Sequence, residues 1–243
     1  MITFPKVLVA AAFTAILSAQ TAEELVNRNL QAKGGIDKIK AIRSLRATGR
    51  LQQGGLTVQV GALAMAPNLL RRSFTVQGMT GIQAYDGNIG WEIAPFEGRK
   101  DPQRLGEDEL RDIVEDAIFL GPLVDYKAQG SRVEYIGKDL IDGDDVYRLK
   151  VTLKNGDLYY YYLDPETFLE VRMEKVRFIR GAVRESVIEC GSYKLVAGVY
   201  MPFTYEVGSK QSAERSKITY DKIEPNVTLD PAEFKMPATG KEL

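Results

Sequence analysis

The stretch SLRATGRLQQGGLTVQVGALA, residues 44–64, alternates two kinds of side chain on both sides of a Gly54–Gly55 pair. Before the glycines, apolar or small residues occupy the odd positions 45 to 51 and polar residues occupy the even positions. After them, Leu56, Val58 and Val60 continue the period of two. Successive side chains of a strand point to opposite faces, so this period predicts two strands, and the glycine pair predicts the turn of an antiparallel hairpin.

The same pattern extends toward the C-terminus. The pairs Asp86–Gly87, Asn155–Gly156 and Asp164–Pro165 mark further turns between alternating segments. We count about ten or eleven strands with turn signals every 8 to 15 residues or so, which is typical of an antiparallel sheet, sandwich or barrel. No repeat or linker divides the chain, so we expect a mainly β (α+β) protein with a single domain over residues 20–243.

Three segments have helical periodicity instead. Residues 22–32 follow a capping box formed by Thr21 and Glu24, and a short apolar face at residues 36–42 comes next. The third segment, from about Glu107 to Leu120, is amphipathic and carries six acidic residues on its polar face. That acidic face is interpreted either as solvated or as a docking surface for a partner.

Residues 1–19 have the layout of a secretory signal peptide. Lys6 precedes an apolar run, and the small residues Ser18 and Ala19 offer a cleavage site. The apolar run is shorter than the roughly 20 residues of a membrane span, although an uncleaved anchor is the alternative. The sequence therefore predicts cleavage after about Ala19 and a location outside the cytoplasm.

The composition excludes several classes of function. Histidine is absent and Cys190 is the single cysteine, so Ser-His-Asp catalysis, Cys-His catalysis and most zinc sites are excluded. The net charge of -1 argues against nucleic acid as a partner. The chain has no phosphate-binding glycine motif, and no pair of carboxylates stands out as a glycosidase pair. We expect no enzyme activity, no catalytic residue, no metal and no cofactor.

Two observations favour a lipid-like ligand. A large antiparallel sheet with few helices on its concave side leaves an apolar hollow that suits an acyl chain, unless side chains fill it. The basic residues Arg71 and Arg72 lie either on a solvated strand face or in contact with anionic lipid headgroups.

Several short motifs, in their order along the chain, resemble the periplasmic lipoprotein carrier family LolA. They are Pro67-Asn68-Leu69, the Asp86–Gly87 turn, Trp91, Pro95-Phe96 and the closing segment at residues 229–237. Residues 22–51 are also similar to bacterial proteins of the outer-membrane lipoprotein-sorting type. The resemblance covers most of the chain from Thr21 to Pro237.

The resemblance implies an incomplete antiparallel barrel, with helices that cover its concave hydrophobic face as a lid. It implies a periplasmic carrier, acting as a monomer, that shelters acyl chains of lipoproteins or related lipids between an inner-membrane donor and an outer-membrane acceptor. An RseB-like periplasmic sensor of mislocalised lipoproteins or lipopolysaccharide, which regulates envelope stress, is the alternative. The family has a lid-closing arginine at the position of Ala66, and Arg71 or Arg72 could replace it.

The expected ligand-binding residues follow from this interpretation. The strand residues and the loop residue Phe96 are expected to line the cavity, the helix residues to form the lid, and Arg71 and Arg72 to contact a headgroup. The cavity and lid residues are Leu51, Val58, Val60, Leu70, Phe74, Val76, Trp91, Ile93, Phe96, Leu110, Ile113, Val114 and Ile118.

Overall fold

The computed structural model describes residues 20–179 and 181–238, so the predicted signal peptide lies outside the described residues. The described residues contain three α-helices, α1 (Ala22–Ala32), α2 (Ile36–Lys40) and α3 (Glu107–Asp116), and two short 3-10 turns, η1 (Pro95–Glu97) and η2 (Pro231–Phe234). None of the described helices is both long enough and apolar enough to cross a membrane.

The strands are more numerous than the sequence predicted. They are β1 (Ser44–Gln53), β2 (Leu56–Met65), β3 (Leu69–Val76), β4 (Met79–Tyr85), β5 (Gly90–Ala94), β6 (Arg99–Arg104), β7 (Arg132–Ile141), β8 (Asp144–Thr152), β9 (Leu158–Leu163), β10 (Glu170–Ile179), β11 (Ala182–Gly191), β12 (Lys194–Val196), β13 (Val199–Met201), β14 (Thr204–Ser209) and β15 (Ser216–Pro225). Alternation does not reveal β6, which reads RKDPQR, or β12, which has three residues, and the alternating segment from Val199 to Val207 divides into β13 and β14.

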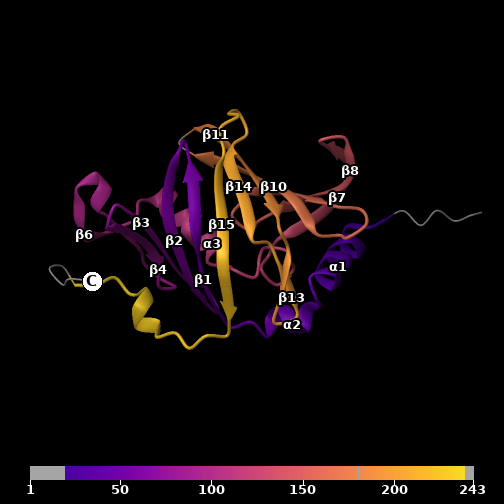
Figure 1. The fold of residues 1–243 in the computed structure, drawn as a ribbon. Coiled ribbons are helices and arrows are strands. Elements are labelled where there is room, and N and C mark those ends of the chain that lie inside the picture. The colour runs from indigo at the N-terminus through magenta and orange to yellow at the C-terminus, as the bar shows by residue number, and fades with distance from the viewer. Residues whose placement is uncertain (1–19, 180, 239–243) are drawn as a thin grey trace, which may run out of the picture.

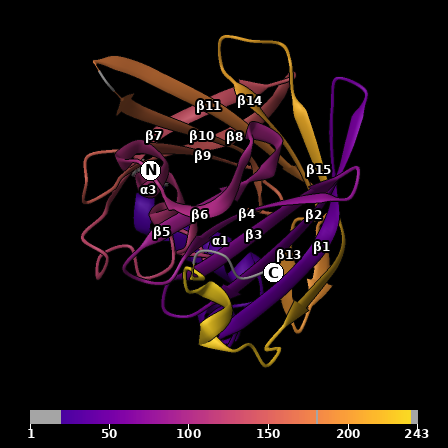
Figure 2. The ribbon, with the colours of Figure 1, turned by 90° about the vertical axis from the view of Figure 1, so that its left-hand side faces the viewer.

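Thirteen of the described strands form one antiparallel sheet in the order β6-β5-β4-β3-β2-β1-β15-β14-β11-β10-β9-β8-β7. The sheet curls without closing, and β6 and β7 remain its two edges (Figure 2). We call β1–β6 the first flank and β7–β11 the second flank, with β15 and β14 joining them. This open, mainly β architecture confirms the predicted fold class.

The helices lie on the concave face of the sheet. This is the face that carries Leu45 and Leu51 of β1, and Figure 1 shows α3 behind β1 and β2. On the second flank, α1 and α2 bury Leu25 and Ile39 against Leu149 and Tyr161 in the largest apolar cluster. On the first flank, α3 buries Ile113 in a separate cluster. The concave face therefore has two helical covers, one on each flank.

The convex face has a cover of its own, formed by the C-terminal segment. Trp91 of β5 is 1% exposed and its Nε1 donates a hydrogen bond of 2.8 Å to the carbonyl oxygen of Phe234. Phe234 itself has no exposed surface, and Met236 packs beside Trp91 and Ile93. We call residues 226–238 the C-terminal strap, because they cross the outside of β3 to β5.

Most of the predicted helix ends agree with the structure. Helix α1 spans the predicted residues 22–32, and the side chain of Thr21 accepts a hydrogen bond of 3.1 Å from the backbone N–H of Glu24. Helix α3 is shorter than predicted, because the chain turns after Asp116 and Ile118 donates to the carbonyl of Glu115 in a tighter turn. Ile118 therefore lies beyond the helix, half-buried.

Candidate functional site: the concave strip and helix α3

A set of apolar side chains shares the concave face of the sheet near the end that holds the β1–β2 hairpin. Strand register places its residues on the same face of β1, β2, β3, β11, β14 and β15. All of them are half-buried, so neither cover seals them completely. We call this surface the concave strip; it consists of Leu51, Val58, Val60, Phe74, Val76, Ile188, Val207 and Ile218.

Two tyrosines, Tyr205 and Tyr220, lie on the same face of the sheet as the strip. The rings of Tyr205 and Tyr220 meet edge to face, with 6.0 Å between their centroids. Burial raises the pKa of Tyr205 well above its ordinary value, and burial also raises the pKa of Tyr220. Both side chains nevertheless keep accessible surface. The two rings therefore border the strip without being fully covered.

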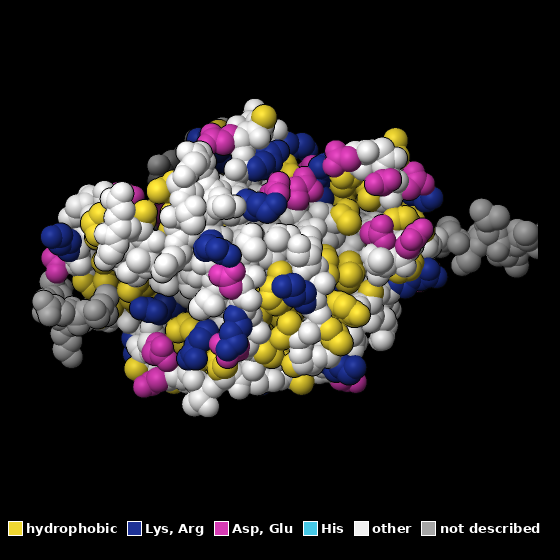
Figure 3. Space-filling view, viewed as in Figure 1, with side chains coloured by type: hydrophobic (Ala, Val, Ile, Leu, Met, Phe, Trp, Pro, Cys, Tyr) yellow, Lys and Arg dark blue, Asp and Glu magenta, His cyan; other side chains and the backbone are white. Residues whose placement is uncertain are grey.

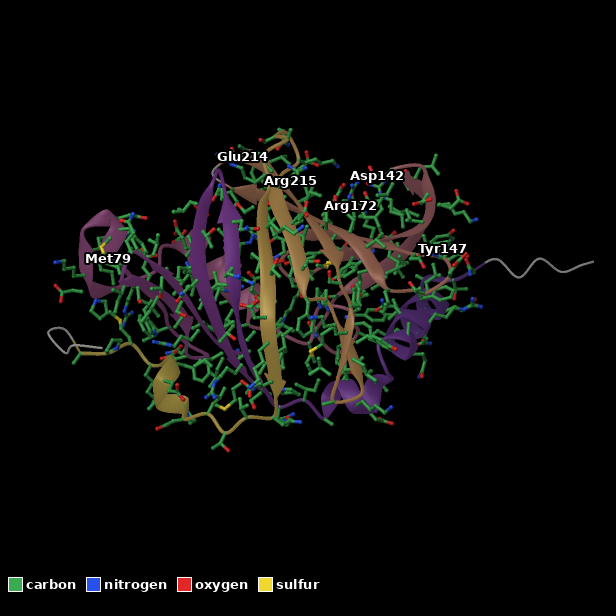
Figure 4. The ribbon with its side chains drawn as sticks, viewed as in Figure 1. Met79, Asp142, Tyr147, Arg172, Glu214 and Arg215 are labelled. Carbon is green, nitrogen blue, oxygen red and sulfur yellow. The ribbon has the colours of Figure 1, made fainter. Side chains whose placement is uncertain are left out.

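Most of the predicted cavity residues share this face. Leu51, Val58, Val60, Phe74 and Val76 belong to the concave strip, and Leu70 lies beside it under α3. The ring of Phe96 approaches the concave side of Gly81, since a Cβ added there would meet it at 3.0 Å. Beyond the strip, Met79 marks the tip of the β3–β4 hairpin, at the opposite end of the molecule from Tyr147 (Figure 4).

The structure separates Trp91 and Ile93 from the other predicted cavity residues. Ile93 pairs with Ile82, and Trp91 pairs with Ala84, on the convex face. The expectation that all these strand residues line one cavity is therefore wrong for Trp91 and Ile93. Alternation correctly puts them on one face of β5, but only the curl of the sheet decides that this face is the outer one.

The predicted lid helix packs its apolar side onto the first flank. Ile113 and Ala117 have no exposed surface and contact Ala64, Leu70 and Tyr85. Leu110 and Val114 pack against the same cluster, and Leu110 also fills the space in front of Gly90. The helix is thus held to β2–β5 by burial of apolar surface.

The acidic side of α3 turns to charged residues from both flanks. Asp116 accepts a hydrogen bond of 2.7 Å from Arg72 of β3 and another of 2.7 Å from Lys175 of β10. Arg177 of β10 donates to Asp112 and, over 2.6 Å, to Glu115. The interpretation of the acidic face as solvated is therefore wrong for Glu115 and Asp116, for which the sheet supplies counter-ions, whereas the side chain of Asp112 stays half exposed.

Further contacts extend this network to the β8–β9 turn. Arg111 binds Asp157 through two nitrogens, and the Nε contact is 2.7 Å. Tyr159 of β9 donates a hydrogen bond of 2.8 Å to Glu115. Helix α3 therefore bridges the two flanks, with an apolar side on one and an ionic side on the other.

The two candidate headgroup residues point in opposite directions. Arg72 lies on the concave face and contacts α3, whereas Arg71 pairs with Leu63 and Ala84 on the convex face. Arg72 thus holds the helix that the resemblance assigns to the lid, while Arg71 lies outside the concave strip. Figure 3 shows charged groups scattered among uncharged ones on the convex surface, and the ion pairs of β1 and β15 on this face include Arg50–Asp221 and Lys222–Glu224.

The described residues contain no group of three or more His, Cys, Asp or Glu that could hold a metal ion. Burial raises the pKa of the Cys190 thiol, so the nucleophilic thiolate is disfavoured.

Acidification is expected to loosen α3. Burial would raise the pKa of Asp116, but Lys175 and Arg72 outweigh it and hold that pKa well below its usual range. Burial would also raise the pKa of Glu115, but the hydrogen bonds that it accepts from Arg177 and Asn155 help to hold that pKa below its ordinary value. A carboxyl whose pKa is lowered by folding stabilises the folded state above its unfolded pKa, and this contribution disappears as the pH falls through the folded pKa. Protection of α3 amides in hydrogen exchange should therefore fall below about pH 4.

The pH experiment has internal controls. Burial raises the pKa of Asp112 and of Asp157, so these two carboxyls act in the opposite sense and cannot cause a loss in acid. Exchange rates are corrected for their intrinsic pH dependence, and α1 serves as the reference helix. Equal loss of protection in α1 and α3 would contradict a specific role for the ionic contacts.

The comparisons with known proteins bear on the fold. No family model matches the chain, and no curated protein matches it in sequence. A DUF1329 family protein from Desulfovibrio piger superposes with a TM-score of 0.61 at 15% identity, over 88% of this chain and 97% of that one. A LolA superfamily protein from Nitrosomonas europaea gives 0.60 at 13% identity, over 89% and 98%. A putative outer membrane lipoprotein-sorting protein domain from Vibrio parahaemolyticus gives 0.55 at 12% identity, over 87% and 94%.

Proposed function

Because the chain has the fold of LolA superfamily proteins, we propose that it is a periplasmic carrier that shelters acyl chains of lipoproteins or related lipids against the concave strip. It performs no catalysis. An inner-membrane donor supplies the acyl chain and an outer-membrane acceptor receives it. The predicted signal peptide, which lies outside the described residues, supports export of the protein.

The concave strip is the observation that carries this proposal. Eight apolar side chains from six strands share one hollow face and remain partly accessible, where a protein core would bury them. Each CH2 group moved from water into such surroundings contributes about 0.8 kcal/mol. An acyl chain completes the burial of the strip and is itself removed from water. Helix α3, which spans the hollow, is the part that opens to admit it.

A pair of neighbouring residues in β2 offers a sharp test. Val60 points to the concave strip and Gln59 points to the convex face. We expect Val60→Asp to weaken the binding of a fluorescent fatty acid by about 10-fold or more, because a carboxylate in an apolar recess is poorly solvated. Gln59→Asp adds the same charge on the same strand and should bind as the unaltered protein does. Equal affinities of the two variants would contradict the proposed site.

The cargo and the carrier role need separate measurements. Mass spectrometry of lipids that co-purify with the exported protein should identify molecules with acyl chains. Passage of a bound fluorescent lipid to acceptor vesicles supports the carrier role. Retention of the lipid in the presence of excess vesicles would contradict transport while leaving the binding site intact.

A further inference from the structure

Three cationic side chains converge on one point of the hollow from opposite flanks of the sheet. Arg72 comes from β3 in the first flank, and Lys175 and Arg177 come from β10 in the second. Their side chains keep 32%, 14% and 10% of their surface exposed, respectively. Five strands separate β3 from β10 in the order of the sheet, so the curl brings these cations together.

The carboxylates that contact this cluster sit on one short helix. Asp116 accepts from Arg72 and Lys175, and Arg177 contacts Asp112 and Glu115. A long-lived cluster of like charges in partly desolvated surroundings requires anions. Helix α3 supplies them from ten residues, and the other side of the helix packs on an apolar cluster that includes Ala64, Leu70 and Tyr85. If α3 moves away, the cations of both flanks are left facing the hollow.

The cluster adjoins the apolar surface. Tyr220 of β15 is close enough to Arg72 and Asp116 for both charges to influence its pKa, and its ring meets Tyr205. Phe74 of the concave strip lies on the same face of β3 as Arg72, two residues along the strand. A molecule with an anionic head and an apolar tail therefore matches the order of charges and apolar groups in the hollow.

We propose that Arg72, Lys175 and Arg177 form the binding site for the anionic head, a phosphate or carboxylate, of an acyl amphiphile, and that the carboxylates of α3 occupy this site when it is empty. The proposal rests on the proposed function and specifies its ligand. Binding replaces the Asp116 carboxylate by the anion of the ligand at Arg72 and Lys175, which removes two of the ionic contacts that hold α3 to the sheet. Anion and acyl chain act together, because the tail gains burial at the moment that the head displaces the helix.

The test compares two amphiphiles with the same tail, dodecyl phosphate and dodecyl maltoside, below their micelle concentrations, by titration calorimetry. The intact protein should bind the phosphate at least 10-fold more tightly. Lys175→Met should weaken phosphate binding about 10-fold, whereas Asp116→Asn, which removes the competing carboxylate, should strengthen it about 10-fold. Neither change should alter maltoside binding by that factor. Opposite effects in two variants of one ion pair cannot both arise from damage to the fold.

The controls separate this inference from the proposed function. Lys217→Met removes an exposed cation on the convex side of β15, where Lys217 pairs with Glu206, and should leave both affinities unchanged. Equal binding of the two amphiphiles would overturn the headgroup site and leave the acyl carrier standing. Binding of neither would overturn both. If inorganic phosphate binds as tightly as dodecyl phosphate, the site binds a free anion, and the proposal that its ligand is an amphiphile is contradicted.

Discussion

Replacing Ile113 with aspartate is expected to detach α3 from the sheet while the sheet stays folded. Ile113 has no exposed surface and packs among Ala64, Leu70 and Tyr85. An ionised carboxylate buried there without a partner costs several kcal/mol, so undocking of the helix is the less costly state. Amide protection of α3 should fall by about 100-fold or more, equivalent to about 3 kcal/mol.

The sheet should survive this change because its other clusters do not depend on α3. The cluster under α1 and α2 and the cluster under the C-terminal strap contain no residue of that helix. Ile113→Asn is the matched control of similar shape to the aspartate, and its neutral amide should loosen the helix less. Far-ultraviolet circular dichroism follows the sheet in parallel. Global unfolding by Ile113→Asp would show that α3 belongs to the cooperative core and is no lid.

Replacing Trp91 with alanine is expected to destabilise the protein by about 3 to 5 kcal/mol without weakening ligand binding. Trp91 is 1% exposed and anchors the C-terminal strap through its hydrogen bond to Phe234. The loss is a large part of the stability of a typical domain, about 5 to 15 kcal/mol, and should appear as a lower thermal midpoint. The strap should also become sensitive to proteases near Phe234.

Trp91→Phe is the matched control, because it keeps most of the apolar volume and removes the indole N–H. Trp91→Phe should lower the free energy of unfolding by about 1 to 3 kcal/mol, because the hydrogen bond to Phe234 is lost. It should also make the C-terminal strap partly sensitive to proteases. Trp91 is the sole tryptophan of the chain, so its emission reports the convex face. Emission should stay constant as an acyl ligand fills the concave strip. A ligand-dependent shift in the intact protein would place the site near Trp91 and contradict the assignment to the concave face.

The sequence predicts best those helices and turns that depend on residues close together in the chain. The helix over residues 22–32 depends on Thr21, on its own apolar spacing and on the glycines that follow, and its bounds agree with the structure. The hairpins at Gly54–Gly55 and Asn155–Gly156 depend on residues that accept the turn conformation, and all three glycines of these turns have positive φ angles. The open antiparallel sheet follows from many such local units.

Contacts between residues far apart in the chain cannot be predicted from the sequence in the same way. Alternation identifies the two faces of β5 but not which of them is concave, and this is why Trp91 and Ile93 were placed in the cavity. Likewise, the acidic residues of α3 are visible in the sequence, whereas their partners Arg72 and Lys175 are 44 and 59 residues from Asp116. The charges of β10 fall on both of its faces, Arg172 and Glu174 on one and Lys175 and Arg177 on the other, so the sequence alone does not show which of them face α3.

The position of β15 also determines when the molecule can assemble. This strand lies between β1 and β14, and the pair Arg50–Asp221 joins residues 171 positions apart. When the chain leaves a ribosome or a membrane channel with its N-terminus first, the strands of the first flank are available long before β15, the partner strand of β1. Until residues 216–225 arrive, β1 and β14 expose unpaired backbone edges, which are sites of aggregation. Completion of the sheet therefore waits until residues 216–225 have been synthesised or transported, and a chain truncated before Ser216 should aggregate and not fold.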